Sequence, residues 1–94
     1  ATLWRANLTN AFLYSADLFS ASLADADLTN ADLRLADLTD AYLLRANLTD
    51  ANLWLADLTD AYFGSAIVTN ANFNDTIWSN TIWTDGVAYD TNQA

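Results

Sequence analysis

The 94-residue sequence contains no cysteine, histidine, lysine, glutamate, proline or methionine. The absence of cysteine excludes disulfides, thiolate metal sites and cysteine nucleophiles. The absence of histidine removes the commonest general base and the commonest transition-metal ligand, and there is no lysine to activate a serine or threonine. We therefore expect a protein that is not an enzyme, has no cofactor and holds no metal.

Long apolar runs and positive charges are also scarce. Although 53% of the residues are hydrophobic, no run approaches the roughly 18 residues that a transmembrane helix needs, and we expect no signal peptide. We expect no membrane partner and take the cytoplasm as the default compartment. Three arginines stand against twelve aspartates, for a net charge of −9. Phosphate binding needs clustered basic side chains, so we expect no direct binding of nucleic acid, whereas a basic protein would be compatible.

The dominant feature of the sequence is a five-residue repeat. Alanine fills the first position of each repeat from Ala1 to Ala71, and leucine fills the third position from Leu3 to Leu58. Five residues advance about 140° on an α-helix, so the leucines would not form a stripe. On a flat strand an odd period sends successive leucines to opposite faces. Because Ala and Leu lie two residues apart and share a face, the chain must bend once per repeat into a coil.

The number of sides follows from the spacing at which similar residues recur. At a spacing of 20 they form columns, such as Thr9, Thr29, Thr49 and Thr69, Asp17, Asp37 and Asp57, or Tyr42 and Tyr62. A spacing of 15 groups unrelated residues, so four repeats make one coil. We number the four sides by the repeats that begin them, residues 1–5, 6–10, 11–15 and 16–20. We predict parallel pairing on all four sides, no α-helix between residues 1 and 80, and an interior filled by Ala and Leu, without a cavity.

The motif A-(D/N)-L-x-x, repeated through residues 1–75, resembles that of the pentapeptide-repeat proteins. The resemblance implies an all-β fold, a right-handed quadrilateral parallel β-helix, here of about four and a half coils. Residues 1–85 would form the β-helix and residues 86–94 a C-terminal cap or tail. The resemblance also implies a protein that is often dimeric and without assigned activity. A few members resemble B-DNA in shape and charge and inhibit DNA gyrase, usually with a C-terminal dimerisation helix that we do not expect here.

The third side is a candidate surface for binding another protein. Its outward residues include two aromatic side chains, an arginine expected to lie between them, and two leucines. These residues are Tyr14, Arg34, Leu35, Trp54 and Leu55. The alternative is a ladder that only shields the edges of the sheet.

The fourth side carries an acidic ladder. Its residues are Asp17, Asp37, Asp40, Asp57 and Asp60. Carboxylates stacked about 4.8 Å apart repel each other, which should raise some of their pKa values. The ladder would mimic a phosphate edge, hold calcium, or hydrogen-bond the nearby backbone. A linear ladder does not converge on one point as a calcium site requires.

The two ends of the rod are candidates for self-association. The first coil offers an apolar cross-section and unpaired backbone groups, and large side chains near the other end are expected to plug it. The candidate end-to-end interface comprises Leu3, Leu8, Leu13, Leu18, Trp78 and Trp83. We therefore expect a homodimer formed through one end, with the N-terminal end favoured.

Two hypotheses for function follow. The first is a non-catalytic scaffold that presents a rigid surface to a protein partner. The alternative is a DNA mimic that occupies the basic groove of an enzyme such as DNA gyrase.

Overall fold

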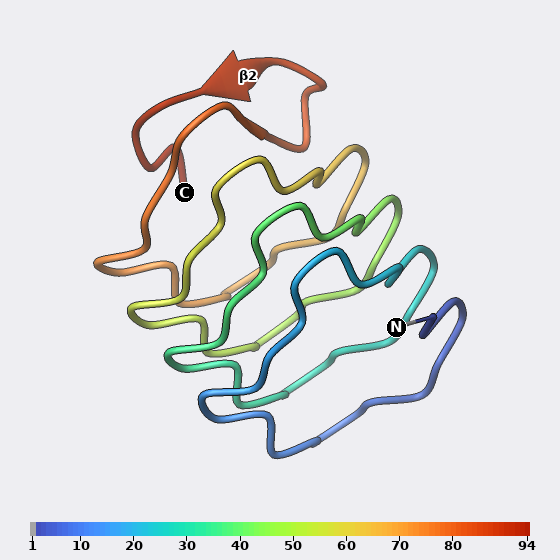
Figure 1. Cartoon of the computed structure of the whole chain (residues 1–94). Coiled ribbons are helices and arrows are strands. Elements are labelled where there is room, and N and C mark those ends of the chain that lie inside the picture. The colour runs from blue at the N-terminus through green and yellow to red at the C-terminus, as the bar shows by residue number, and fades with distance from the viewer. Residues whose placement is uncertain (1) are drawn as a thin grey trace.

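The chain winds into a stack of four-sided coils in a computed structural model that describes residues 2–94 (Figure 1). Parallel β-bridges join residues 20 apart, such as Thr2 and Ser22 on the first side and Asp17 and Asp37 on the fourth. Bridges of the same kind occur on the second and third sides, and residues 2–94 include no α-helix. The fold is the predicted right-handed quadrilateral parallel β-helix. Ala1, expected at an inward position, lies outside the described residues.

Three backbone hydrogen bonds per repeat hold neighbouring coils together. The amide of Leu23 donates to the carbonyl oxygen of Tyr42 (2.7 Å), and the amide of Asp25 donates to that of Leu44 (2.8 Å). In the opposite direction, the amide of Tyr42 donates to the carbonyl oxygen of Ala21 (2.9 Å). These bonds run along the axis of the rod, so each coil pairs with the coil before it and the coil after it.

Each corner is a tight turn with a left-handed residue at the fifth position of the repeat. At one corner the amide of Ala26 donates to the carbonyl oxygen of Leu23 (3.1 Å), and Asp25 between them has a φ of 58°. One positive φ at the third residue of such a turn is typical of type II. Sixteen non-glycine residues, at every fifth position from Arg5 to Asn80, have a positive φ. The repeat therefore bends where the sequence requires it, but through a conformation that L-residues disfavour.

The interior is filled by the first and third positions of the repeat, as predicted. The alanines from Ala21 to Ala61 and the leucines from Leu23 to Leu58 are buried and form one apolar core. Alanine alternates with leucine because four side chains meet at each level of a narrow square, where a second large residue would overpack it.

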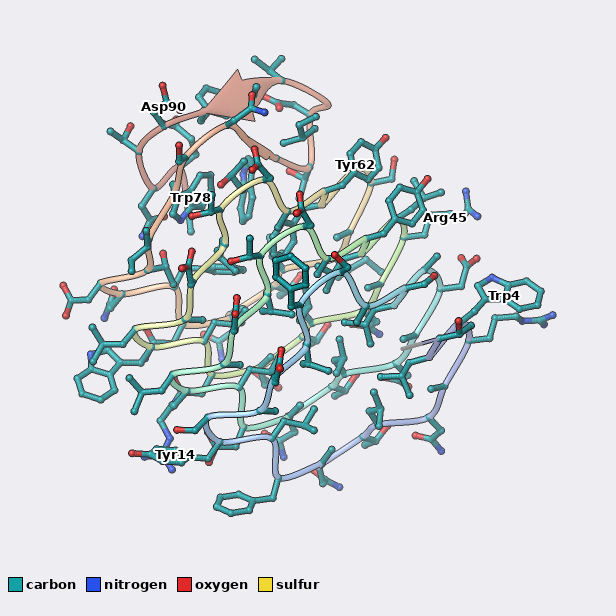
Figure 2. The ribbon with its side chains drawn as sticks, in the orientation of Figure 1. Trp4, Tyr14, Arg45, Tyr62, Trp78 and Asp90 are labelled. Atoms are coloured by element: carbon teal, nitrogen blue, oxygen red, sulfur yellow. The ribbon has the colours of Figure 1, made fainter. Side chains whose placement is uncertain are left out.

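A short hairpin closes the C-terminal end. Strand β1 (Thr81–Ile82) pairs antiparallel with β2 (Ala88–Tyr89), and Gly86, with a φ of 82°, lies in the connection. Trp78, before the hairpin, and Trp83, in its connection, are only 6% and 8% exposed and pack against each other. Trp83 also packs against Phe63 and Phe73. Figure 2 shows Trp78 inside the rod near its upper end. Both tryptophans lie at the end of the apolar core, and the hairpin spans the expected boundary between residues 85 and 86.

Candidate functional surfaces

The third side presents apolar side chains to solvent. Tyr14, Leu35 and Trp54 are 45%, 40% and 39% exposed, and Leu55 is half-buried beside them. The repeat places all four outward, because only its first and third positions face the core. Tyrosine, tryptophan and arginine are the residues most enriched where protein partners bind tightly.

Arg34 contacts one aromatic side chain of this surface rather than two. Its guanidinium carbon lies 5.1 Å from the centre of the Tyr14 ring. Asp32 holds the same guanidinium, accepting hydrogen bonds from Nε and Nη2 at 2.8 and 2.7 Å. These hydrogen bonds hold the pKa of Asp32 below its usual value and raise the pKa of Arg34. The expectation that Arg34 lies between two aromatic rings is therefore wrong for Trp54.

Phe12 extends the third-side surface and was missed in the sequence. Its ring stacks beside Tyr14, with centroids 6.4 Å apart, and it is 78% exposed. The sequence could have identified it, because an aromatic residue stands here at a position that is polar one and two coils further on, as Asp32 and Asn52. We define the third-side surface as Phe12, Tyr14, Arg34, Leu35, Trp54 and Leu55.

The two leucines of this surface occupy left-handed corners. Leu35 and Leu55 both have a φ of 60°. A bulky residue there is strained, and asparagine or aspartate would fit the corner better. Both leucines are thus unfavourable for two reasons: their backbone is left-handed, and their apolar side chains remain in contact with solvent.

The acidic ladder of the fourth side is tied to the backbone. Asp17, Asp37 and Asp57 each accept a hydrogen bond from the amide two residues further on, at 3.1, 3.0 and 3.0 Å. Asp40 and Asp60 occupy left-handed corners, with φ values of 59° and 56°. This arrangement supports the alternative in which the carboxylates hydrogen-bond the nearby backbone, which is a structural role for the ladder.

Repulsion does not dominate this ladder. The side chain and the amide of Thr39 donate to Asp37 and hold the pKa of that carboxyl below its usual value. The expectation of a raised pKa is therefore wrong for Asp37, since hydrogen bonds to the charged form outweigh the effect of desolvation. Within residues 2–94 no three acidic side chains converge where they could hold a metal ion.

The first coil bears a ring of exposed aromatic side chains. They are Trp4, Phe12, Tyr14 and Phe19. Figure 2 shows Trp4 and Tyr14 projecting from opposite sides of the rod. Among the leucines expected at an end-to-end interface, Leu3, Leu8 and Leu13 are half-buried, and Leu18 is buried. The structure leaves little of Trp78 or Trp83 for a partner, because both side chains are buried.

The interior is filled as expected, but the C-terminal end is hollow on one side. A hollow of about 380 Å³ lies between residues 70–74 and the tail, lined by Asn70, Ala71, Asn72, Phe73, Asn74, Asn92 and Ala94. Asn92 holds the tail in place by donating through Nδ2 to the carbonyl oxygen of Phe73 (2.7 Å). The expectation of a rod without a cavity is therefore wrong at this end. Among residues 2–94 there is no helix long and apolar enough to cross a membrane.

Comparison with known proteins places the chain in a family. The pentapeptide repeats, in eight copies, match residues 1–34, 16–54 and 36–75. The pentapeptide repeat protein Rfr23 from the cyanobacterium Cyanothece 51142 is 33% identical, with a TM-score of 0.86 over 88% of this chain and 57% of its own. Alr5209, a pentapeptide repeat protein from Nostoc Pcc 7120, is 30% identical, with a TM-score of 0.82 over 97% of this chain and 77% of its own.

The chain thus spans a little over half the length of Rfr23. No curated protein matches it. Both the repeat and the coil geometry are shared with these relatives, and the chain belongs to the pentapeptide repeat proteins.

Proposed function

We propose that this protein is a non-catalytic scaffold that presents its third side to a protein partner. The observation that carries the proposal is the pair Leu35 and Leu55, exposed or half-buried at a φ of 60°. Strain that local structure does not require is retained where a functional surface needs the side chain. The aromatic rings of Tyr14 and Trp54 give the same surface the composition of a protein-binding site.

A non-catalytic role is supported by the composition. The sequence offers no histidine, cysteine or lysine as base or nucleophile. The carboxylates of the fourth side accept backbone hydrogen bonds or occupy corners, so they are arranged along the rod rather than across a cleft.

The test uses the double variant Leu35→Asn/Leu55→Asn. Asparagine tolerates the left-handed corner, so we expect the melting temperature to stay the same or rise while partner capture falls. The matched control is Asp40→Asn/Asp60→Asn, which changes two corners of the fourth side.

The readout is cross-linking to proteins from the native host, quantified for wild type and both variants. A partner captured by wild type and by the control, but lost from the leucine variant, supports the proposal. A leucine variant that captures the same proteins as wild type rejects it. A fall in its melting temperature would show that the leucines are structural.

The alternative function is a DNA mimic, favoured by the distribution of charge. Beyond Arg45 the chain has six aspartates and no arginine or lysine. Such a surface would compete for a basic groove on an enzyme like DNA gyrase. A gyrase supercoiling assay tests this function, and the absence of inhibition at high micromolar protein rejects it.

A further inference from the structure

On its second and third sides, the last full coil has backbone amides that pair with no carbonyl oxygen within residues 2–94. One coil lower, the equivalent amides each donate to a carbonyl oxygen of this coil: Leu48 to Ile67 (2.7 Å), Asp50 to Thr69 (3.0 Å), Leu53 to Asn72 (2.7 Å) and Leu55 to Asn74 (3.1 Å). The amides of Val68, Asn70, Phe73 and Asp75 donate no hydrogen bond within residues 2–94. The reason is that the chain leaves the coil at Gly86 and returns beside β1 (Figure 1).

This edge therefore offers four donors in the register that another coil would use. Side chains of the core are also less covered here than further down. Val68 and Ala71 are half-buried, whereas Leu48 and Ala51, one coil lower in the same columns, are buried. An open strand edge above partly exposed apolar side chains is a template for a further strand.

The hollow described above lies against the third-side part of this edge. Its lining combines four asparagines with the apolar residues Ala71, Phe73 and Ala94. Such a mixture suits an extended peptide that places one apolar side chain inward while its backbone bonds to the edge.

The charge around the edge is negative. Asp75 ends the edge, and Asp50 accepts a hydrogen bond from Nδ2 of Asn70 (2.6 Å) at the corner between the two sides. No arginine or lysine follows Arg45 in the sequence. A peptide with lysine or arginine side chains is therefore complementary.

We propose that this edge binds a basic peptide by β-strand addition. The peptide follows the edge around the corner at Asn70, as the coil itself does. Its carbonyl oxygens accept hydrogen bonds from the free amides of Asn70, Phe73 and Asp75, and an apolar side chain enters the hollow. Basic side chains lie beside Asp50 and Asp75. This site differs from the third-side surface because it faces along the axis of the rod rather than outward.

The affinity test uses a fluorescein-labelled peptide of alternating lysine and valine, followed by fluorescence anisotropy. We expect saturable binding that Asp75→Lys weakens by about tenfold, the effect of one well-placed charge. Asp40→Lys is the matched control, since Asp40 and Asp75 are both exposed corner residues, with φ values of 59° and 58°.

We expect the control to change affinity by less than about twofold, as for a charge beyond the Debye length. We also expect a glutamate–valine peptide not to bind. Equal weakening by Asp40→Lys and Asp75→Lys overturns the proposal, because net charge alone would then account for binding. Absence of saturation overturns it as well.

Amide hydrogen exchange tests the strand geometry directly. In the free protein, the amides of Asn70, Phe73 and Asp75 should exchange rapidly, while that of Leu53, bonded one coil lower, exchanges slowly. Saturating lysine–valine peptide should slow the three edge amides at least tenfold and leave Leu53 unchanged. A peptide N-methylated at alternate residues should not protect them.

Two results contradict this geometry. Binding without protection of the edge amides would place the peptide elsewhere on the acidic surface. Protection that is already present in the free protein, and is lost on dilution, would show that a second copy occupies the edge.

Discussion

Replacing Ala36 by leucine tests the packing of the square core. Ala36 is 1% exposed, and the coils on either side are tied to its own by short bonds, with the amide of Asp57 donating to its carbonyl oxygen at 3.0 Å. Leucine adds three carbon atoms, which would stabilise the protein by roughly 0.8 kcal/mol each if there were room. In a filled core the same atoms force strained rotamers and separate the coils, for a net cost of about 1–3 kcal/mol.

That cost corresponds to a fall in melting temperature of about 4–24 °C, since each kcal/mol shifts a domain of this size by about 4–8 °C. The measurement is thermal unfolding followed by circular dichroism. The matched control is Ala88→Leu: Ala88 is exposed on β2 and lies outside the core cluster. We expect the control to stay within about 0.5 kcal/mol of wild type. Equal effects of the two substitutions, or an unchanged melting temperature for Ala36→Leu, would refute the inward assignment.

Three further predictions concern local bonds and assembly. Asn47 accepts hydrogen bonds from the amide and hydroxyl of Thr49 (3.1 and 2.6 Å). In urea unfolding, Asn47→Ala should lower the free energy of unfolding by about 1 kcal/mol, whereas Asn47→Asp, which keeps the acceptor, should not. Equal losses in the two variants would contradict this. The pKa of Asp37 is lowered by folding, so its contribution to stability is present above its ordinary value of 3.8 and is lost as the pH falls below it. Below about pH 4, wild type should therefore lose stability more steeply than Asp37→Asn, and parallel profiles would exclude this linkage. The homodimer stays a prediction, which sedimentation at micromolar concentration tests. Trp4→Asp should dissociate a dimer formed through the N-terminal end, and Val87→Asp should not. A wild-type protein that sediments as a monomer would reject the dimer.

Features that obey the repeat could be predicted because one interaction recurs at every level of the rod. The burial of Leu33 and Ala36 follows from the phase of the period, and the four sides follow from the columns spaced by 20 residues. Averaging over many copies removes the ambiguity that a single short apolar segment would have. The two large residues Trp78 and Trp83 could be assigned to the plug because they stand at the inward third position.

Features that depend on one local competition could not be predicted. From the sequence, Arg34 could contact either the aromatic side chains of its column or a nearby carboxylate. In the structure its Nε and Nη2 both donate to the carboxylate of Asp32. The path after Asp85 depends on one glycine turn and a two-residue pairing, for which the repeat carries no information. The free amides and the hollow follow from that path, so they could not be predicted from the sequence either.

The spacing of the backbone bonds has a consequence for how this rod can change in length. Every backbone–backbone hydrogen bond between coils joins residues 19 or 21 apart in the chain. Insertion or deletion of 20 residues would preserve every column, whereas a change of five would rotate everything beyond it by a quarter turn about the axis. Leu35 and Leu55 would then face different directions, although the core would remain continuous. Lineages that keep a surface on one side should therefore gain or lose whole coils, while single-repeat changes redistribute the surface without unfolding the protein.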